Sequence, residues 1–343
     1  MPVNAATDPV LVEVTRGPVI ESRHHGAIVV VDAAGRRRAA IGDVEQPVFP
    51  RSAVKALQAL PLVESGAADR YGFGNAELAL ACSSHNGEPR HVETAAAMLA
   101  RAGRTGADLE CGPQMPVADT AAHELIRAGR EPTALHNNCS GKHAGFICVC
   151  AHRGFDVKGY VEPDHPVQRE ITATLADVTG TRLDDAVRGV DGCSIPTYAI
   201  PLDRLALGFA RFITGEGLSP GRAAAARRLA AACMAEPWMV AGSGRFCTAA
   251  MTGLRGELFV KTGAEGVFCA ALPDSGLGIA IKCDDGAGRA AEAVMAAAIA
   301  AFVREAGDEF QIRPVLNRRG RKVGEIRPVA GLVEALRDGR PIS

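Results

Sequence analysis

The sequence lacks several features that would define a function class at once. Its 38 basic and 39 acidic side chains nearly cancel, leaving a formal charge of -1, so the charge count offers no cationic face for nucleic acid. No stretch approaches the roughly eighteen apolar residues of a membrane span, and residues 1–21 show no signal-peptide pattern. We therefore expect a cytoplasmic protein that acts on a small neutral or zwitterionic molecule, with no nucleic-acid or membrane partner.

Lysine is scarce as well. Of the 38 basic residues only six are lysine, and arginine supplies the rest. Arginine keeps its proton in proteins, whereas a desolvated lysine amine can lose it and act as a base. Each lysine is therefore a candidate for chemistry; the six stand at positions 55, 142, 158, 261, 282 and 322.

The composition is otherwise that of a folded protein, with 47% hydrophobic and 22% charged residues. In a reducing compartment its ten cysteines are expected to be buried thiols, metal ligands or nucleophiles rather than disulfides. We find no internal repeat and no linker long enough to separate independent domains. Residues 1–343 are therefore expected to form one domain.

Hydrophobic periodicity predicts strands near both ends of the chain and helices between them. This pattern indicates an α+β fold in which the terminal segments pair into one antiparallel sheet flanked by helices, and the middle forms a mainly helical lobe. The predicted sheet lobe covers about 1–50 and 240–343, the helical lobe about 51–239, and a cleft should lie between them. The predicted strands are 10–14, 20–22, 27–31, 257–262, 267–272 and 276–282, and the predicted helices are 51–64, 87–101, 119–128, 140–152, 166–177, 219–235 and 288–305, with Ser140 and Ser219 as N-caps.

Ser52 and Lys55 stand three residues apart in the first turns of a predicted helix. That spacing places the hydroxyl and the amine on one face, close enough for the amine to accept the hydroxyl proton. The positive end of the helix lowers the pKa of the lysine, and its free N–H groups can hold an oxyanion. The spacing alone is a weak match, since an exposed serine and a surface lysine would show it too.

Two further elements strengthen the first. Ser84-His85-Asn86 offers a second hydroxyl with a carboxamide two residues on, and Lys261-Thr262-Gly263 places a lysine at the end of a predicted strand. Gly263 would allow close backbone approach to a ligand. Ser-x-x-Lys, Ser-x-Asn and Lys-Thr-Gly in this order are the elements of penicillin-recognising serine enzymes. The combination predicts two serine–lysine pairs, Ser52 with Lys55 and Ser84 with Lys261, facing one pocket.

A second polar cluster combines the run His136 to His143 with Asp191-Gly192-Cys193. Cys139 and Cys193, with Lys142 or His143, could bind zinc, although two thiolates are fewer than a structural zinc site uses. The same residues are also compatible with buried thiols beside a polar loop. Spacing leaves the two interpretations open.

Several blocks of the chain resemble the L-asparaginase II family of the Rhizobium type. They include VFPRSAVKALQALPLVESGAA, ACSSHNGEP, LHNNCSGKHAGF, GVDGCSIPTYA and KTGAEGVF, and the likeness runs from about residue 10 to 285. The resemblance implies hydrolysis of L-asparagine to L-aspartate and ammonia, a fold related to the glutaminase and serine β-lactamase group, and a homodimer.

The resemblance also implies roles for individual residues. Ser52, Lys55, Ser84 and Lys261 would be catalytic, and a zinc ion beside the pocket would be held by Cys139, Lys142 and Cys193. Arg51 and Asp191 are candidates for binding the substrate's α-carboxylate and α-amino group. The alternatives are a glutaminase or penicillin-recognising hydrolase and, from another class, a non-catalytic binding protein held together by zinc.

Overall fold

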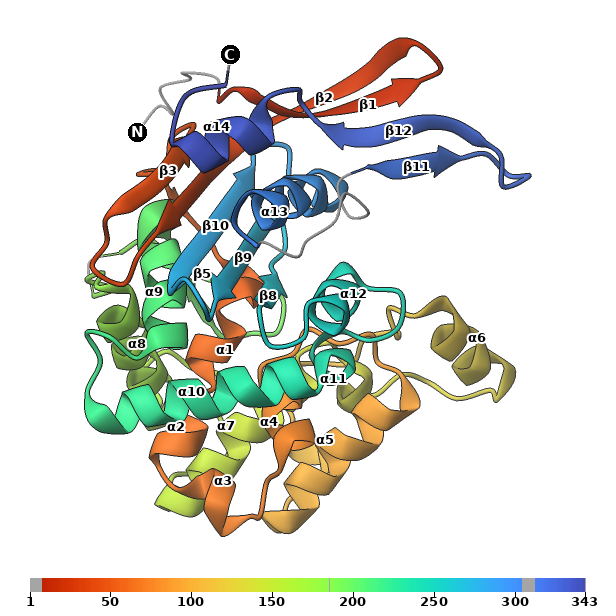
Figure 1. Cartoon of the computed structure of the whole chain (residues 1–343). Helices are drawn as coiled ribbons and strands as arrows, with labels where there is room; N and C mark the ends of the chain where they lie inside the picture. The colour runs from red at the N-terminus through yellow and green to blue at the C-terminus, as the bar shows by residue number, and fades with distance from the viewer. Residues whose placement is uncertain (1–7, 185, 304–311, 343) are drawn as a thin grey trace.

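The computed structural model describes residues 8–184, 186–303 and 312–342. Its main element is an antiparallel sheet whose strands follow the order β11-β12-β1-β2-β10-β9-β8, with β3 paired to β2. The first and last strands of the chain thus lie side by side (Figure 1), as the sequence predicts. The strands are β1 (Val10–Arg16), β2 (Val19–Val31), β3 (Arg37–Ile41), β8 (Phe259–Thr262), β9 (Val267–Leu272), β10 (Leu277–Cys283), β11 (Arg313–Leu316) and β12 (Lys322–Pro328).

Helices cover the centre of this sheet. Every residue of β9 is buried, which requires cover on both faces. The cover comes from α9 (Leu202–Thr214), which packs on β2, β9 and β10, and from α13 (Gly288–Phe302), which packs on β9, β10, β1 and β12. Figure 1 shows α13 in front of the sheet and α14 (Leu332–Asp338) beside it. The architecture is α+β, as expected.

The remaining helices form the mainly helical part of the molecule, drawn in the lower half of Figure 1. Two short strand pairs accompany them, β4 (Pro47–Val48) with β7 (Ile200–Pro201) and β5 (Arg188–Val190) with β6 (Pro196–Tyr198). The helices are η1 (Arg51–Val54), α1 (Lys55–Gln58), α2 (Leu60–Glu64), α3 (Ala67–Arg70), α4 (Asn75–Ala81), α5 (Pro89–Arg101), η2 (Gly106–Asp108), α6 (Asp119–Arg127), η3 (Ala134–His136), α7 (Ser140–Arg153), α8 (Pro166–Thr179), α10 (Pro220–Ala235), α11 (Pro237–Ala241) and α12 (Phe246–Gly253).

Three details of the predicted elements are wrong. The segment 51–64 is not one helix but the succession η1, α1 and α2, and its Pro61 lies in the first turn of α2, where a missing N–H costs nothing. Gly26 does not break a strand, because β2 runs through it. A Cβ at Gly26 would lie 2.3 Å from the carbonyl oxygen of Lys282 on β10, so the glycine permits close pairing.

The third correction concerns a helix start. Ser140 is the first residue of α7 and not its N-cap, which is Cys139. The Ser140 hydroxyl instead bonds His85, and Asn137 Oδ1 accepts from the Cys139 backbone N–H at 2.8 Å. Ser219 caps α10 as predicted. The end of the predicted helix 288–305, at Glu305, lies outside the described residues.

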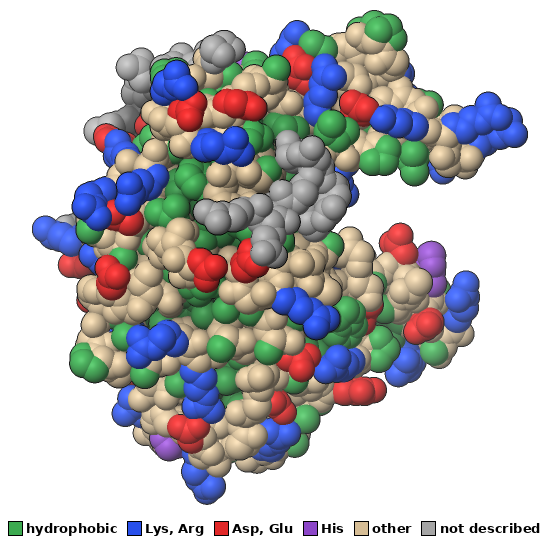
Figure 2. All heavy atoms as spheres, in the orientation of Figure 1, with side chains coloured by type: hydrophobic (Ala, Val, Ile, Leu, Met, Phe, Trp, Pro, Cys, Tyr) green, Lys and Arg blue, Asp and Glu red, His purple; other side chains and the backbone are tan. Residues whose placement is uncertain are grey.

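The surface bears out the charge count. Figure 2 shows basic and acidic side chains interspersed over the visible face, in keeping with the formal charge of -1. All ten cysteines are buried and free. No helix among the described residues combines the length and the apolar character needed to cross a membrane.

Candidate active site

A pocket of about 350 Å³ lies where the end of β8 meets the loops of the helical part. Both predicted nucleophiles, Ser52 and Ser84, line it, together with Asp191 and Arg245. Ser52 comes from η1, directly after the sheet-to-helix connection, and Ser84 follows α4. Two serines more than thirty positions apart therefore line one cavity, as the sequence predicts.

The connection before Ser52 is held against the sheet. A Cβ at Gly263 would lie 2.6 Å from the carbonyl oxygen of Pro50, so the glycine of Lys-Thr-Gly brings β8 close to the backbone leading into η1. The close approach predicted for Gly263 is therefore to this backbone. Arg51 has a φ of +50°, a strained conformation for a residue with a side chain, and such strain concentrates at functional sites.

The two predicted bases are fully buried. Lys55 is 0% and Lys261 1% exposed, and neither lines the pocket. Burial lowers the pKa of Lys55 below its ordinary value. Burial, reinforced by the nearby charge of Lys55, lowers the pKa of Lys261 to about 7. The Lys261 amine can therefore exist without a proton near neutral pH, and burial shifts the pKa of Lys55 in the same direction.

Both amines donate hydrogen bonds to backbone oxygens, and Lys55 also has a hydrogen bond with the side chain of Cys139. Lys55 Nζ donates to the Asn138 carbonyl oxygen at 3.3 Å, and Lys261 Nζ donates to that of Thr262 at 2.9 Å. A neutral amine that donates one hydrogen bond keeps its lone pair for a proton. These backbone bonds therefore leave the lysines able to act as bases.

The predicted metal ligands also come together. Lys142 Nζ lies 3.0 Å from Cys193 Sγ, and Cys139 and Cys193 both line the pocket. A hydrogen bond from Cys193, with the charges of Lys55 and Lys142, lowers the pKa of Cys139 well below its usual range although burial opposes this. The hydrogen bond to Cys139 raises the pKa of Cys193. The pair thus shares one negative charge, next to an ammonium group.

This donor set fits zinc in kind. Zinc prefers thiolate and nitrogen donors and tolerates an open fourth position at catalytic sites. Within the described part of the chain, no three His, Cys, Asp or Glu side chains come together as a metal site. The predicted trio depends on lysine as its third donor.

The predicted substrate-binding residues pair with each other. Arg51 Nε donates to Asp191 Oδ1 at 2.6 Å, and both side chains line the pocket. Burial alone would raise the pKa of Asp191, but the charges of Lys142 and Arg51 hold it below its ordinary value. Asp191 is therefore an anion at the pocket wall.

Among the pocket residues that sequence reasoning missed, Arg245 is the charged one. Arg245 lines the cavity, and its guanidinium donates to Asn86 Oδ1 at 3.0 Å. Among 32 arginines nothing in its spacing singles it out. The signal in the sequence was its partner Asn86, because the Ser-x-Asn element had already placed that residue near the pocket.

Comparison with known proteins assigns the chain to a family. The profile of the L-asparaginase II family matches residues 12–328. No curated protein shows significant similarity to the chain. Solved structures similar to it include a β-lactamase from Mycobacterium bovis (14% identity, 78% of this chain and 89% of that one, TM-score 0.33) and a simvastatin synthase from Aspergillus terreus (13% identity, 76% and 86%, TM-score 0.37).

TM-scores this low carry no argument, so the description of the fold rests on the sheet and helices of this chain. The family profile covers nearly the whole sequence, including every predicted catalytic residue. The chain therefore belongs to the L-asparaginase II family, and its activity is of the asparaginase, amide-hydrolysing type.

Proposed function

We propose that this protein hydrolyses L-asparagine to L-aspartate and ammonia through a serine-bound acyl intermediate. The observations that support the proposal are that Ser52 and Ser84 line one pocket and that Lys55 and Lys261, their predicted partners, are fully buried lysines of lowered pKa. A buried amine is costly to a fold, and a proton-free amine beside an alcohol is what acyl transfer by serine requires.

In the proposed reaction Ser52 Oγ attacks the carbon of the side-chain carboxamide, and Lys55 Nζ takes the hydroxyl proton. Backbone N–H groups hold the resulting oxyanion. The C–N bond then breaks, and the nitrogen leaves as ammonia after taking up a proton. Water attacks the aspartyl ester, releases aspartate and returns the proton to Ser52. Ser84 and Lys261 relay protons to the leaving group and from the water.

The substrate is zwitterionic, and the pocket offers charges of both signs. Asp191 can accept hydrogen bonds from the α-ammonium group, and a guanidinium can bind the α-carboxylate. The volume of about 350 Å³ lies at the small end of ligand pockets, which favours a single amino acid over a penicillin. Glutamine is one methylene longer, and a pocket discriminates one methylene only modestly.

Zinc remains part of the proposal. Cys139, Lys142 and Cys193 would hold the ion, with Lys142 giving up its proton to do so. When bound, zinc would supply positive charge next to the substrate's polar end. The steps at Ser52 depend on Lys55 and need no metal-bound group.

The test is ammonia release from asparagine, glutamine and a penicillin, followed by intact-protein mass spectrometry during turnover and peptide mapping. We expect ammonia from asparagine and one aspartyl group on the peptide containing Ser52. Opening of the penicillin without ammonia release would favour the penicillin-recognising alternative. Absence of turnover, with unfolding on chelation, would favour the non-catalytic zinc protein.

The assembly and location also stay predictions. We propose a homodimer, which light scattering coupled to size-exclusion chromatography measures directly. A mass of one chain, 35.7 kDa, would contradict it. Cytoplasmic location is tested by cell fractionation.

A further inference from the structure

This inference rests on the proposed function and concerns the recognition of the substrate's α-carboxylate. Two arginines line the pocket, Arg51 and Arg245. Arg51 pairs with Asp191 through the 2.6 Å bond from its Nε, so a protein carboxylate balances its charge. Among the described residues no carboxylate forms an ion pair with Arg245, whose one hydrogen bond goes to a neutral carboxamide. Arg245 is thus the pocket cation whose charge no protein anion balances.

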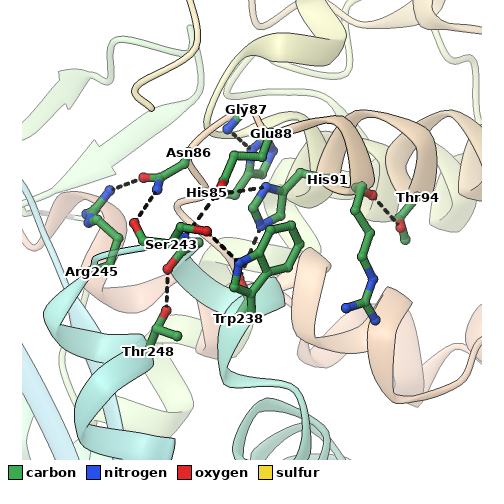
Figure 3. A network of polar contacts seen from close by, with 12 residues as sticks. His85, Asn86, Gly87, Glu88, His91, Thr94, Trp238, Ser243, Arg245 and Thr248 are labelled. Carbon is green, nitrogen blue, oxygen red and sulfur yellow. Dashed lines mark hydrogen bonds and ion pairs between the residues drawn. The ribbon is translucent and has the colours of Figure 1, made fainter. Parts of the chain in front are cut away.

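The position of Arg245 is fixed by a network that Figure 3 shows. Asn86 Oδ1 accepts from Arg245 Nη1 at 3.0 Å, and Asn86 Nδ2 donates to the backbone oxygen of Ser243 at 3.0 Å. The backbone N–H of Ser243 donates to Glu88 Oε2, also at 3.0 Å. The carboxamide therefore uses both of its ends to hold the chain segment that carries Arg245.

The same segment is fastened next to the second serine. The backbone N–H of Ser84 donates to the Val240 carbonyl oxygen at 3.0 Å. Between these contacts lies Gly242, with a φ of +111°, where a Cβ would come within 2.5 Å of Glu88 Oε2 and 2.6 Å of Asn86 Nδ2. No side chain fits there, so the backbone is shaped to hold residues 240–245 against residues 84–88. These contacts hold Arg245 at a fixed position relative to Ser84.

We propose that Arg245 binds the α-carboxylate of the substrate and that Asn86 is its positioning residue. Arg51 then serves to orient Asp191 toward the α-ammonium group. An arginine can meet a carboxylate with two parallel N–H donors, and one end of the Arg245 guanidinium remains for the ligand when Nη1 bonds Asn86. In this proposal the asparagine of the Ser-x-Asn element positions the Arg245 guanidinium for the ligand.

The test compares substrates that differ by one charged group. 3-Aminopropanamide has the amide and the amino group of asparagine but no α-carboxylate, and succinamate has the amide and the carboxylate but no amino group. For each variant we measure kcat/KM for both and for L-asparagine. Because every ratio is taken within one preparation, a partly unfolded sample lowers both rates equally and leaves the ratio unchanged.

For Arg245→Gln we expect the ratio of asparagine to 3-aminopropanamide to fall roughly 10- to 100-fold, the usual size of a lost charge-assisted contact. The same variant should lower kcat/KM for succinamate by about as much as for asparagine. Asn86→Ala should lower the same ratio by less, about 3- to 10-fold, because Arg245 remains but loses the hydrogen bond that fixes its position. Arg245→Lys keeps the charge but loses the pair of parallel donors, so its ratio should fall by less than that of the glutamine variant. If the glutamine variant does not fold, an unchanged ratio in Arg245→Lys would contradict the inference.

The matched control is Arg90→Gln. Arg90 lies over the ring of Trp238 at the far side of the same network and pairs with Glu236, outside the pocket, so its ratio should equal that of the wild type. An unchanged ratio in Arg245→Gln, in a wild type that hydrolyses asparagine, would overturn the inference alone. A wild type that releases no ammonia from asparagine would overturn the proposed function, and the inference with it.

Discussion

Two buried lysines of this protein differ in their charge. Lys261, at the end of β8, is 1% exposed, and burial with the neighbouring Lys55 lowers its pKa to about 7. Lys142, in α7, is equally buried. Burial opposes its charge too, but Cys193, Cys139 and Asp191 raise its pKa above the ordinary value. Burial alone therefore does not make a lysine a base, because the charges that face the amine determine whether its pKa is raised or lowered.

Lys55 lies between these cases. Cys139 and Cys193 raise the pKa of Lys55, whereas burial and the charge of Lys142 lower it. Burial has the largest effect, so the pKa lies below the ordinary value. The sulfur pair and Asp191 thus hold Lys142 as an ammonium, whereas burial favours the neutral form of Lys55 and Lys261, which separates one cation from two candidate bases. The predictions below test this separation, beginning with the largest effect.

The largest expected effect is loss of turnover in Ser52→Ala and in Lys55→Arg. Alanine removes the nucleophile, and arginine keeps a positive charge but cannot accept a proton. Each should lower kcat for asparagine by about 1,000-fold or more. Ammonia release measured by a coupled assay checks this.

Two variants serve as matched controls. Ser83, next to Ser84, has a buried hydroxyl without a hydrogen-bond partner among the described residues, so Ser83→Ala should be folded and fully active. Lys158→Arg changes an exposed lysine and should also be neutral. Full activity in Lys55→Arg would exclude Lys55 as the base.

The next effect is on stability, and its sign should differ between the two lysines. Lys261→Met should stabilise the protein at pH 7 by about 2 kcal/mol, because it removes a buried amine that the unfolded chain would protonate. Lys142→Met should destabilise the metal-free protein by about 1–3 kcal/mol, because it leaves the sulfur pair without its cation. Urea unfolding measures both.

The pH dependence follows from the pKa of Lys261. Its folded-state pKa, about 7, lies below the ordinary 10.5, so the unfolded chain binds more protons between these values. Wild-type stability should therefore rise with pH from about 7 to 10.5 through this group. The advantage of Lys261→Met should shrink over the same range. An advantage that grew with pH would mean that Lys261 is buried as an ammonium.

A smaller expected effect concerns metal content. The purified protein should hold about one zinc ion per chain, and Cys139→Ala and Cys193→Ala should each lose most of it, since loss of a ligand costs zinc sites much of their affinity. Elemental analysis after desalting measures this without reference to activity. Cys148→Ala, which changes a buried thiol whose pKa burial raises to about 12, is the control. Equal zinc content in all three variants would exclude the sulfur pair as ligands.

The sequence predicted what depends on periodicity and spacing. The paired terminal strands, the central helices and the convergence of Ser52 and Ser84 on one pocket are all observed. Cys139 and Cys193 line the same pocket, which the family resemblance and not their spacing implied. Spacing could not show that Arg51 pairs with Asp191, because that contact joins loops 140 residues apart. Nor could it show that Asn86 holds Arg245, because the two lie 159 residues apart.

The errors have local causes. Ser140 precedes a helical pattern and looks like a cap, but a tertiary contact with His85 takes its hydroxyl. Gly26 looks like a strand break, but the neighbouring strand needs the space that its missing side chain leaves. In both places a partner distant in sequence overrides a local preference.

The most direct test of the account is a pH titration of the lysine side chains by NMR, with carbon-13 at Cε. Only six lysines are present, and single Lys→Arg variants assign the resonances. In the metal-free protein the Lys261 signal should titrate near pH 7, and the wild-type kcat should rise with pH as the two bases lose their protons. A Lys261 midpoint close to the ordinary value of 10.5 would contradict the claim that a proton-free amine serves this pocket.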